Sequence, residues 1–176
     1  ASAFAARELE FKRVLFLVHR NQIVKQALKS YRKVFGGQVS MGMVTGKYQD
    51  YDADFVFATI QTLSKTDILS QYNREHWDLI IIDEAHHSSA DSYKKIMDYF
   101  KPKLWLGMTA TPDKRDDHLG DRNIYEIFNH QIAYEIRLQD AMEEDLLCPF
   151  HYFGITDLDL IADGGKSSEE KIENFR

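Results

Sequence analysis

The stretch of sequence that decides the fold is Leu79-Ile80-Ile81-Ile82-Asp83-Glu84-Ala85-His86. Its four leading apolar residues, three of them β-branched, form a run that is too short for a buried helix. Such a run is typical of an inner strand of a parallel sheet that is covered on both faces. Two carboxylates follow at the carboxyl end of this strand, which is the edge where open α/β sheets bind their ligands. The stretch therefore predicts a ligand site at Asp83 and Glu84.

The two adjacent carboxylates allow two interpretations. Burying such a pair without a cation is costly, so the side chains either point into solvent or hold a positive ion. Mg²⁺ fits the second interpretation because it keeps several waters and takes one or two carboxylates together with substrate phosphates. In that case Asp83 orients the hydrated metal ion, and Glu84 positions or deprotonates the attacking water.

Apolar runs and helical repeats on both sides of this stretch predict the rest of the fold. We expect strands at 14–18, 41–44, 54–58, 79–82 and 104–108, with helices at 1–11, 23–35, 59–72 and 88–100. Further along, we expect a helix at 124–128, a strand at 131–136, a helix at 138–147 and an edge strand at 149–155. Strands that alternate with helices over this length predict an α/β fold, with a parallel, doubly wound sheet and helices on both faces.

Composition is that of an ordinary soluble globular domain, since 44% of the 176 residues are hydrophobic and 28% are charged. No apolar run reaches the length of a membrane span, and no leader with a basic and then an apolar part is visible. The single cysteine, Cys148, excludes an internal disulfide and fits a reducing compartment. We therefore expect a cytoplasmic, intracellular protein without membrane contact.

The charge is unevenly distributed along the chain. Residues 135–176 carry a net charge of −7, whereas residues 1–134 carry a net charge of +1. A phosphate-binding surface on the first part is therefore possible only locally. We expect one domain over residues 1–148, and a linker or the start of a connection to another domain over residues 149–176, where the chain becomes polar and acidic.

One segment resembles a phosphate-binding loop but does not meet its requirements. Gly42-Met43-Val44-Thr45-Gly46-Lys47-Tyr48 is one residue short of the spacing that such a loop needs. Tyr48 also replaces the Ser or Thr whose hydroxyl reaches Mg²⁺, and no helix pattern follows. We therefore expect no phosphate-binding loop in this chain.

Polar groups also follow the other predicted strands. His19-Arg20 forms a cationic loop after strand 14–18. Thr59-Ile60-Gln61-Thr62-Leu63 opens a helix, where hydroxyl, amide and backbone N–H groups make a good anion site. Thr109-Ala110-Thr111, followed by Pro112, ends strand 104–108.

Together, and in this order, the four polar stretches resemble motifs of superfamily 2 helicases of the DEAD/DEAH type. Asp83 to His86 resembles motif II (the Walker B box), and Thr109-Ala110-Thr111 resembles motif III. His19-Arg20 resembles motif Ia, and residues 59–63 resemble the next nucleic-acid motif. The chain resembles the DNA helicases and translocases of the ResIII (restriction-subunit-related) group more than it resembles the RNA helicases of the DEAD-box set. The resemblance covers nearly the whole chain and implies a RecA-like P-loop NTPase fold, incomplete at its N-terminus.

The resemblance implies a role for each matched residue. Asp83 would bind Mg²⁺ through water, Glu84 would activate water for attack on the γ-phosphate, and His86 would link the nucleotide site to motif III. The residues that would relay nucleotide state to the nucleic-acid cleft are Thr109, Ala110 and Thr111. The residues that would contact the nucleic-acid backbone are His19, Arg20, Thr59 and Gln61. Such contacts position a strand without reading its sequence.

The implied function is ATP-driven translocation or unwinding on DNA, with RNA as the alternative substrate. ATP and Mg²⁺ would be the cofactors, and a second RecA-like domain of the same polypeptide would be a partner. The family's phosphate-binding loop, which precedes the first helix, and the arginine finger of the second domain are missing from this chain. Because phosphoryl transfer relies on these groups, we expect the chain by itself neither to hydrolyse ATP nor to unwind nucleic acid.

Two other interpretations stay open. The chain could be a non-catalytic nucleic-acid-binding module, whose binding the acidic C-terminal part would make weak and salt-sensitive. Alternatively, the carboxylates could belong to the metal site of a different hydrolase, although no known ligand spacing is matched. Its further ligands would be His86, His87, His118, His130 and Asp91.

Overall fold

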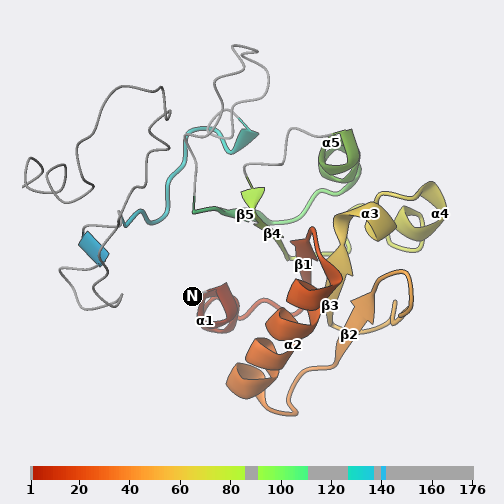
Figure 1. The fold of residues 1–176 in the computed structure, drawn as a ribbon, viewed down its shortest axis with the longest axis horizontal. Coiled ribbons are helices and arrows are strands. Elements are labelled where there is room, and N and C mark those ends of the chain that lie inside the picture. The colour runs from red at the N-terminus through yellow and green to blue at the C-terminus, as the bar shows by residue number, and fades with distance from the viewer. Residues whose placement is uncertain (1, 86–90, 111–126, 137–139, 142–176) are drawn as a thin grey trace, which may run out of the picture. The chain divides into compact units, whose positions relative to one another are not determined.

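The computed structural model describes residues 2–85, 91–110, 127–136 and 140–141. The chain divides into two compact units, residues 1–132 and 133–176, and the fold is that of the first unit. Its described elements, labelled in Figure 1, are α1 (Ser2–Glu8), β1 (Val14–Val18), α2 (Asn21–Phe35), β2 (Met41–Val44), β3 (Phe55–Thr59), α3 (Ile60–Leu63), α4 (Thr66–Leu69), β4 (Leu79–Asp83), α5 (Asp91–Tyr99) and β5 (Leu104–Met108). The predicted boundary at residue 148 lies outside the described residues and stays a prediction.

The five strands form one parallel sheet in the order β2-β3-β1-β4-β5. Val14 of β1 lies beside Phe55 on one side and Leu79 on the other, so β1 is the central strand. β4 lies between β1 and β5, which confirms that the deciding stretch is an inner strand of a parallel sheet. Because every pair is parallel, the carboxyl ends of all five strands lie at the same edge.

Successive side chains of the strands belong alternately to two hydrophobic clusters, one on each face of the sheet. From β1, Leu15 and Leu17 belong to one cluster, while Val14, Phe16 and Val18 belong to the other. The first cluster is covered by α3, α4 and α5, and the second by α1 and α2. Figure 1 shows these helices on opposite sides of the strands. The predicted α/β fold with helices on both faces is therefore confirmed.

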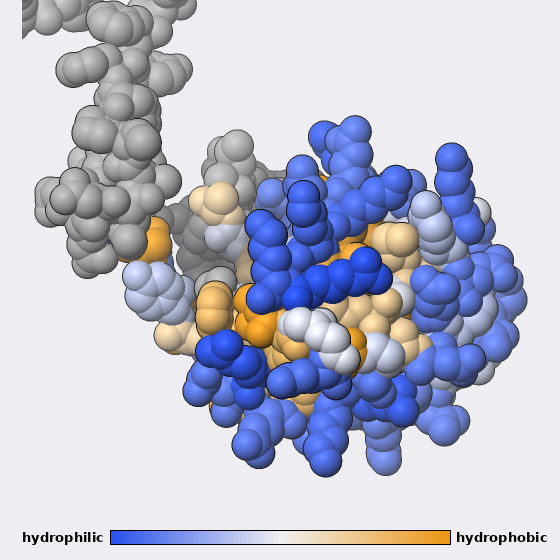
Figure 2. All heavy atoms as spheres, turned by 90° about the horizontal axis from the view of Figure 1, so that it is seen from below, coloured by the Kyte–Doolittle hydropathy of each residue, from blue (hydrophilic) through white to orange (hydrophobic). Residues whose placement is uncertain are grey.

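The surface of this unit is mainly hydrophilic. Figure 2 shows one face on which hydrophilic side chains surround smaller hydrophobic areas. Among the described residues, the large hydrophobic side chains that are exposed are Phe4, Leu9, Tyr48, Leu104, Ile132 and Tyr134. None of the described helices has the length and apolar character that crossing a bilayer requires.

Two predicted elements were wrong. The helix expected over 59–72 is two short helices, because Lys65 adopts an extended conformation between them (φ −67°, ψ 136°). Short polar side chains such as Ser64, whose Oγ donates to the carbonyl of Gln61, compete with continued helix formation. The strand expected over 131–136 does not form, and its large side chain Tyr134 is 75% exposed.

The other predicted helix and strand boundaries either differ from the observed ones by a few residues or lie outside the described residues. α2 begins two residues earlier than predicted, and β3 is shifted by one residue. The helix expected over 1–11 is observed over Ser2–Glu8, and the one expected over 88–100 is observed over Asp91–Tyr99. The predicted elements at 124–126, 142–147 and 149–155 lie outside the described residues.

Gly42, the first glycine of the rejected phosphate-loop candidate, is explained by packing. A Cβ atom at this position would lie 2.4 Å from the Cβ of Asp50 and 3.0 Å from that of Ala53. The chain after β2 folds back along the strand: the Asp50 N–H donates to the carbonyl of Met43, and the Met43 N–H donates to Oδ2 of Asp50, both at 3.0 Å. No helix follows within residues 45–54.

Replacing Gly42 by alanine should therefore lower the free energy of unfolding by about 1–3 kcal/mol, because the new methyl group meets backbone-anchored atoms that cannot turn away. Urea unfolding of the protein measures this loss. Gly46→Ala is the matched control, since a Cβ at Gly46 would meet nothing within 4 Å. Equal unfolding midpoints for the two variants would show that the segment around Asp50 does not pack on β2 as described.

Candidate functional site

The parallel register brings the ends of four strands together at one edge of the sheet. Val18 of β1 lies beside Thr59 of β3, and Asp83 of β4 lies beside Met108 of β5. Leu17, one residue before the end of β1, is flanked by Ala58 and Ile82. The polar segments that follow β1, β3, β4 and β5 therefore begin at neighbouring positions on this edge, which we call the carboxyl edge.

Asp83 and Glu84 lie at the carboxyl edge where β4 ends, between β1 and β5. Both side chains are half-buried. Burial and, after it, the negative charge of Glu84 raise the pKa of the Asp83 carboxyl above its usual value. Two half-buried carboxylates that follow each other at the end of an inner strand therefore repel one another.

The backbone of Glu84 has an unusual conformation. Its φ of 56° lies in the left-handed region, which few residues other than glycine adopt. Holding such a residue costs on the order of 1–3 kcal/mol, and residues of this kind concentrate at active sites and ligand clamps. This left-handed residue follows directly on Asp83, the last residue of β4, and so ends the strand.

The donor set at this position suits Mg²⁺ bound together with a phosphate ligand. Oxygen atoms are the ligands that Mg²⁺ prefers, and it needs only one or two carboxylates when phosphates and waters complete its shell. A divalent cation would also offset the burial and the mutual repulsion that raise the pKa of Asp83. Within the described residues, no group of three or more His, Cys, Asp or Glu side chains could hold a metal ion. Of the ligands considered for a different metallohydrolase, His86, His87 and His118 lie outside the described residues.

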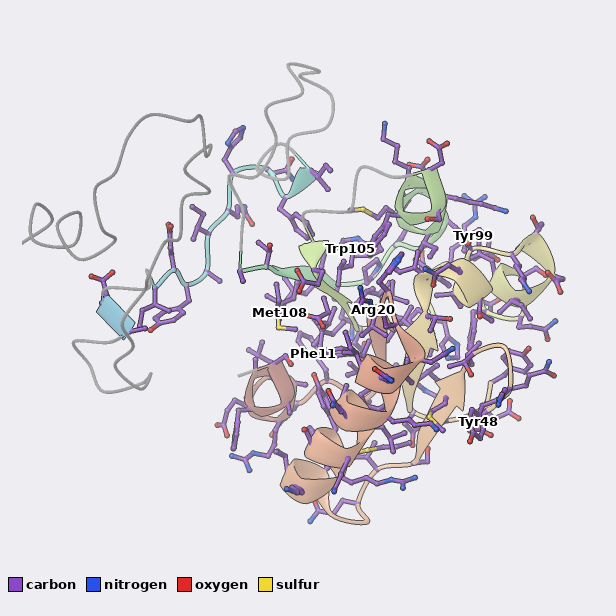
Figure 3. The ribbon with its side chains drawn as sticks, in the orientation of Figure 1. Phe11, Arg20, Tyr48, Tyr99, Trp105 and Met108 are labelled. Carbon is purple, nitrogen blue, oxygen red and sulfur yellow. The ribbon has the colours of Figure 1, made fainter. Side chains whose placement is uncertain are left out.

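The segments after β1 and β3 are joined by a side-chain contact. Nε2 of Gln61 lies 3.0 Å from Nδ1 of His19, which links residues 42 positions apart in the sequence. Both side chains are exposed, and so is Arg20, which lies at the amino-terminal end of α2 (Figure 3). His19, Arg20 and Gln61 are thus accessible to a ligand at the carboxyl edge.

Thr59 is placed differently from the three exposed residues. Its side chain is buried, with 5% of its surface exposed, and its Oγ1 donates to Oγ1 of Thr62 at 2.9 Å. The hydroxyl therefore closes the turn from β3 into α3 within the protein. Any contribution of Thr59 to ligand binding would have to pass through the orientation of this turn.

The segment after β5 lies close to the segment after β4. Gly107 pairs with Ile82, and a Cβ atom on Gly107 would lie 3.1 Å from the Cβ of Ala85 and 2.7 Å from Cζ of Phe128. Of the predicted coupling residues, Thr109 is half-buried and Ala110 is exposed, whereas Thr111 lies outside the described residues, as does His86.

Two closely packed residues, Gly107 and Tyr93, were not singled out from the sequence. Gly107 interrupts an apolar strand, which is a general signal of close backbone approach. Tyr93 of α5 lies within the helix expected over 88–100 and belongs to none of the matched motifs. Nothing in a single sequence marks a buried tyrosine as different from a core aromatic residue.

Comparison of the sequence with known proteins identifies the family to which this chain is similar. Residues 1–114 match the family described as ResIII, type III restriction enzyme, res subunit. The chain is 32% identical over 153 residues to the putative ATP-dependent helicase IRC3 of Saccharomyces cerevisiae, a match that covers 82% of this chain and 21% of that protein. It is 28% identical over 174 residues to the type I restriction enzyme EcoAI endonuclease subunit of Escherichia coli, covering 92% of this chain and 20% of that protein.

The fold also matches solved structures. The structure of a hypothetical ATP-dependent RNA helicase from Sulfolobus tokodaii superposes with a TM-score of 0.59 at 21% identity, over 72% of this chain and 40% of that chain. This likeness confirms the RecA-like fold. The chain spans about a fifth of the length of the two curated relatives.

Proposed function

This chain belongs to the ResIII family, and from that membership we propose that it is part of the first RecA-like domain of an ATP-dependent DNA helicase or translocase. The observation that carries the proposal is the Asp83–Glu84 pair, half-buried at the carboxyl end of an inner strand, where burial and the charge of Glu84 raise the pKa of Asp83. The 32% identity to a putative ATP-dependent helicase over most of this chain supports the same activity.

Asp83 and Glu84 would have different roles in phosphoryl transfer. Asp83 would hold hydrated Mg²⁺ from the rigid end of β4, and bound Mg²⁺ supplies positive charge to the phosphoryl oxygens as negative charge develops on them. Glu84, whose left-handed backbone ends the strand, would orient the attacking water and accept its proton. His86, which resembles the last residue of the motif, would connect this site to the segment after β5.

The segment after β5 would report the state of the nucleotide site. Met108 lies directly beside Asp83, and Gly107 leaves no room between β5 and Ala85. A displacement of the carboxylates would therefore be transmitted to Thr109, Ala110 and Thr111 through contacts that cannot be compressed. This arrangement suits the coupling role that the family motif implies.

The exposed residues of the carboxyl edge would contact the nucleic-acid backbone. His19 and Arg20 bring polar and cationic groups to the end of β1, and Gln61 fixes the position of the His19 ring. Thr59 would act indirectly, since its hydroxyl holds the turn that presents Gln61. Contacts of this kind bind any sequence, as a translocating motor requires.

ATP hydrolysis by the full-length protein tests the proposal. Turnover should be measured without nucleic acid, with single-stranded DNA, with duplex DNA and with RNA. Stimulation by DNA supports a DNA-dependent motor. Stimulation by RNA alone would assign the chain to an RNA helicase. Nucleic-acid binding without any hydrolysis would instead support a non-catalytic binding module.

Replacing Arg20 by alanine should raise the DNA concentration needed for half-maximal stimulation several-fold. One lost phosphate contact should also reduce the slope of log affinity against log salt by about 1. DNA binding measured at several salt concentrations gives both values.

Arg32→Ala is the matched control for this experiment. Arg32 is exposed on the same helix but lies 12 residues further along, about 18 Å away at the helical rise per residue. Its removal deletes an equal charge far from the carboxyl edge. If both variants weakened DNA binding equally, the effect would come from net charge and not from a contact made by Arg20.

A further inference from the structure

The segment that follows β2 carries an exposed lysine next to an exposed tyrosine. Lys47 and Tyr48 belong to the stretch that does not meet the requirements of a phosphate-binding loop, and Tyr48 is one reason why it does not. Tyr48 is 40% exposed (Figure 3), and Lys47 is exposed as well. An accessible aromatic ring beside a cation is the combination with which proteins bind single-stranded nucleic acid.

The parallel register places this segment at the carboxyl edge. Val44, the last residue of β2, lies beside Ala58, which in turn lies beside Leu17 of β1. β3 separates β2 from β1, so the ends of these two strands are about 10 Å apart at the usual strand spacing. A nucleic-acid strand that contacts the segments after β1 and β3 therefore has the segment after β2 next to it. The exposed side chains that follow these three strands are Arg20, Gln61, Lys47 and Tyr48.

Main-chain contacts hold the tip of this segment. The Thr45 N–H donates to the carbonyl of Tyr48 at 2.9 Å, and Val44 and Gln49 form an antiparallel bridge. The Lys47 N–H donates to Oγ1 of Thr45 at 3.3 Å, and Thr45 is buried. These bonds use the main chain of Lys47 and Tyr48, so neither the ammonium group nor the phenol ring is needed to form the turn.

Tyr51, three residues further on, is placed differently from Tyr48. Its ring packs against the core cluster, with its centroid 6.2 Å from that of Tyr72. Tyr51 therefore anchors the segment on the domain, whereas Tyr48 is exposed at the tip. The acidic Asp50 accepts a hydrogen bond from the Met43 N–H, which places its carboxylate back along β2 and not at the tip.

We propose that Lys47 and Tyr48 bind single-stranded DNA, with the Tyr48 ring stacked on an unpaired base and the Lys47 ammonium group on a neighbouring phosphate. Every base has a π face, so such a contact accepts any sequence, as a translocating motor requires. A base inside a duplex is stacked on both faces, so the contact distinguishes an unpaired strand from a duplex. The inference rests on the proposed function, because it extends the nucleic-acid contacts of the carboxyl edge to the end of β2.

The test measures DNA binding by the full-length protein, with a single-stranded oligonucleotide of mixed sequence and with the blunt duplex of the same sequence. Tyr48→Leu keeps an apolar side chain but removes the aromatic face, whereas Tyr48→Phe keeps the ring. The Kd of Tyr48→Leu for single-stranded DNA should rise about 5-fold or more, the factor that corresponds to the stacking of one base. Its Kd for the duplex should be unchanged, and Tyr48→Phe should resemble the wild type with both ligands.

Two further variants control this comparison. Phe4→Leu makes the same kind of change at a side chain that is 52% exposed on α1, which precedes β1, and it should not alter DNA binding. Lys47→Ala should reduce the slope of log affinity for single-stranded DNA against log salt by about 0.7, the value for one phosphate contact. Urea unfolding of Tyr48→Leu should match the wild type, because the main chain holds the turn.

The outcomes separate this inference from the function on which it rests. If Tyr48→Leu and Tyr48→Phe bind single-stranded DNA equally well while DNA still stimulates ATP turnover, the stacking contact is overturned and the proposed function stands. An equal loss of affinity for duplex and single strand also overturns it, because the segment would then contact a backbone and not an unpaired base. A clearly lower unfolding midpoint of Tyr48→Leu would overturn it too, since the ring would then have a structural role. If the wild type neither binds DNA nor hydrolyses ATP, both fail together.

Discussion

Replacing Glu84 by glutamine in the full-length protein should reduce ATP turnover by about 10²- to 10⁴-fold, the range expected when a general base is removed. Glutamine keeps the size of the side chain and one carbonyl acceptor, but it cannot take a proton from water. The substitution also removes the negative charge that helps to raise the pKa of Asp83. ATP binding should therefore stay within a few-fold of the wild type or become tighter. Steady-state turnover and a nucleotide titration measure the two effects separately.

Glu75→Gln provides the matched control. Glu75 is exposed and precedes β4, at the opposite end of the strand from Glu84. The same chemical change there should leave turnover unaltered. A Glu84→Gln variant as active as Glu75→Gln would remove Glu84 from the reaction and would favour the non-catalytic binding module.

The strands of the sheet could be predicted from the sequence because their burial leaves a simple signal. All five residues of β1 are buried, and so are the first four of β4, which is why both appear as continuous apolar runs. A strand covered on both faces needs no alternation, and its length is set by the layers of helix above and below it.

Two predicted elements were wrong because the local sequence does not determine them: one helix is interrupted, and one expected strand has no neighbouring strand to pair with. Apolar residues between 59 and 72 repeat at helical spacing, yet Lys65 is extended and divides the segment into α3 and α4. Residues 131–136 have strand-like composition, but a strand requires a neighbour to pair with, and none of the described strands pairs with them. Pairing is a property of the whole chain and cannot be found in six residues.

The candidate site was predictable in position but not in detail. Parallel strands place the residues that follow them at one edge, so polar groups after β1, β3, β4 and β5 had to approach one another. The contact between His19 and Gln61, the internal bond from Thr59 to Thr62 and the left-handed backbone of Glu84 depend on packing between segments. No periodicity or spacing encodes such contacts.

Replacing Phe57 by alanine should lower the free energy of unfolding by about 3–5 kcal/mol, the largest loss of stability that we expect from a single side chain in this domain. Phe57 is 1% exposed in β3, between β2 and β1. Its ring centroid lies 5.1 Å from that of Tyr31 in an edge-to-face arrangement and 5.8 Å from that of Phe16. Alanine would remove this burial and both aromatic contacts, one of which joins α2 to the sheet, and would leave a cavity that rigid strands cannot close.

The same substitution at Phe4, which is 52% exposed, should change the free energy of unfolding by less than about 1 kcal/mol. Urea unfolding of the two variants gives the comparison directly. The destabilisation caused by Phe57→Ala also bears on function. Thr59 lies two residues later on the same strand, and its hydroxyl holds the turn that presents Gln61. Nucleic-acid stimulation of Phe57→Ala should therefore fall before the domain unfolds completely as urea is added. If the Phe57 and Phe4 variants were equally stable, α2 could not pack on β3 as the structure describes, and the carboxyl edge would lose the scaffold that positions it.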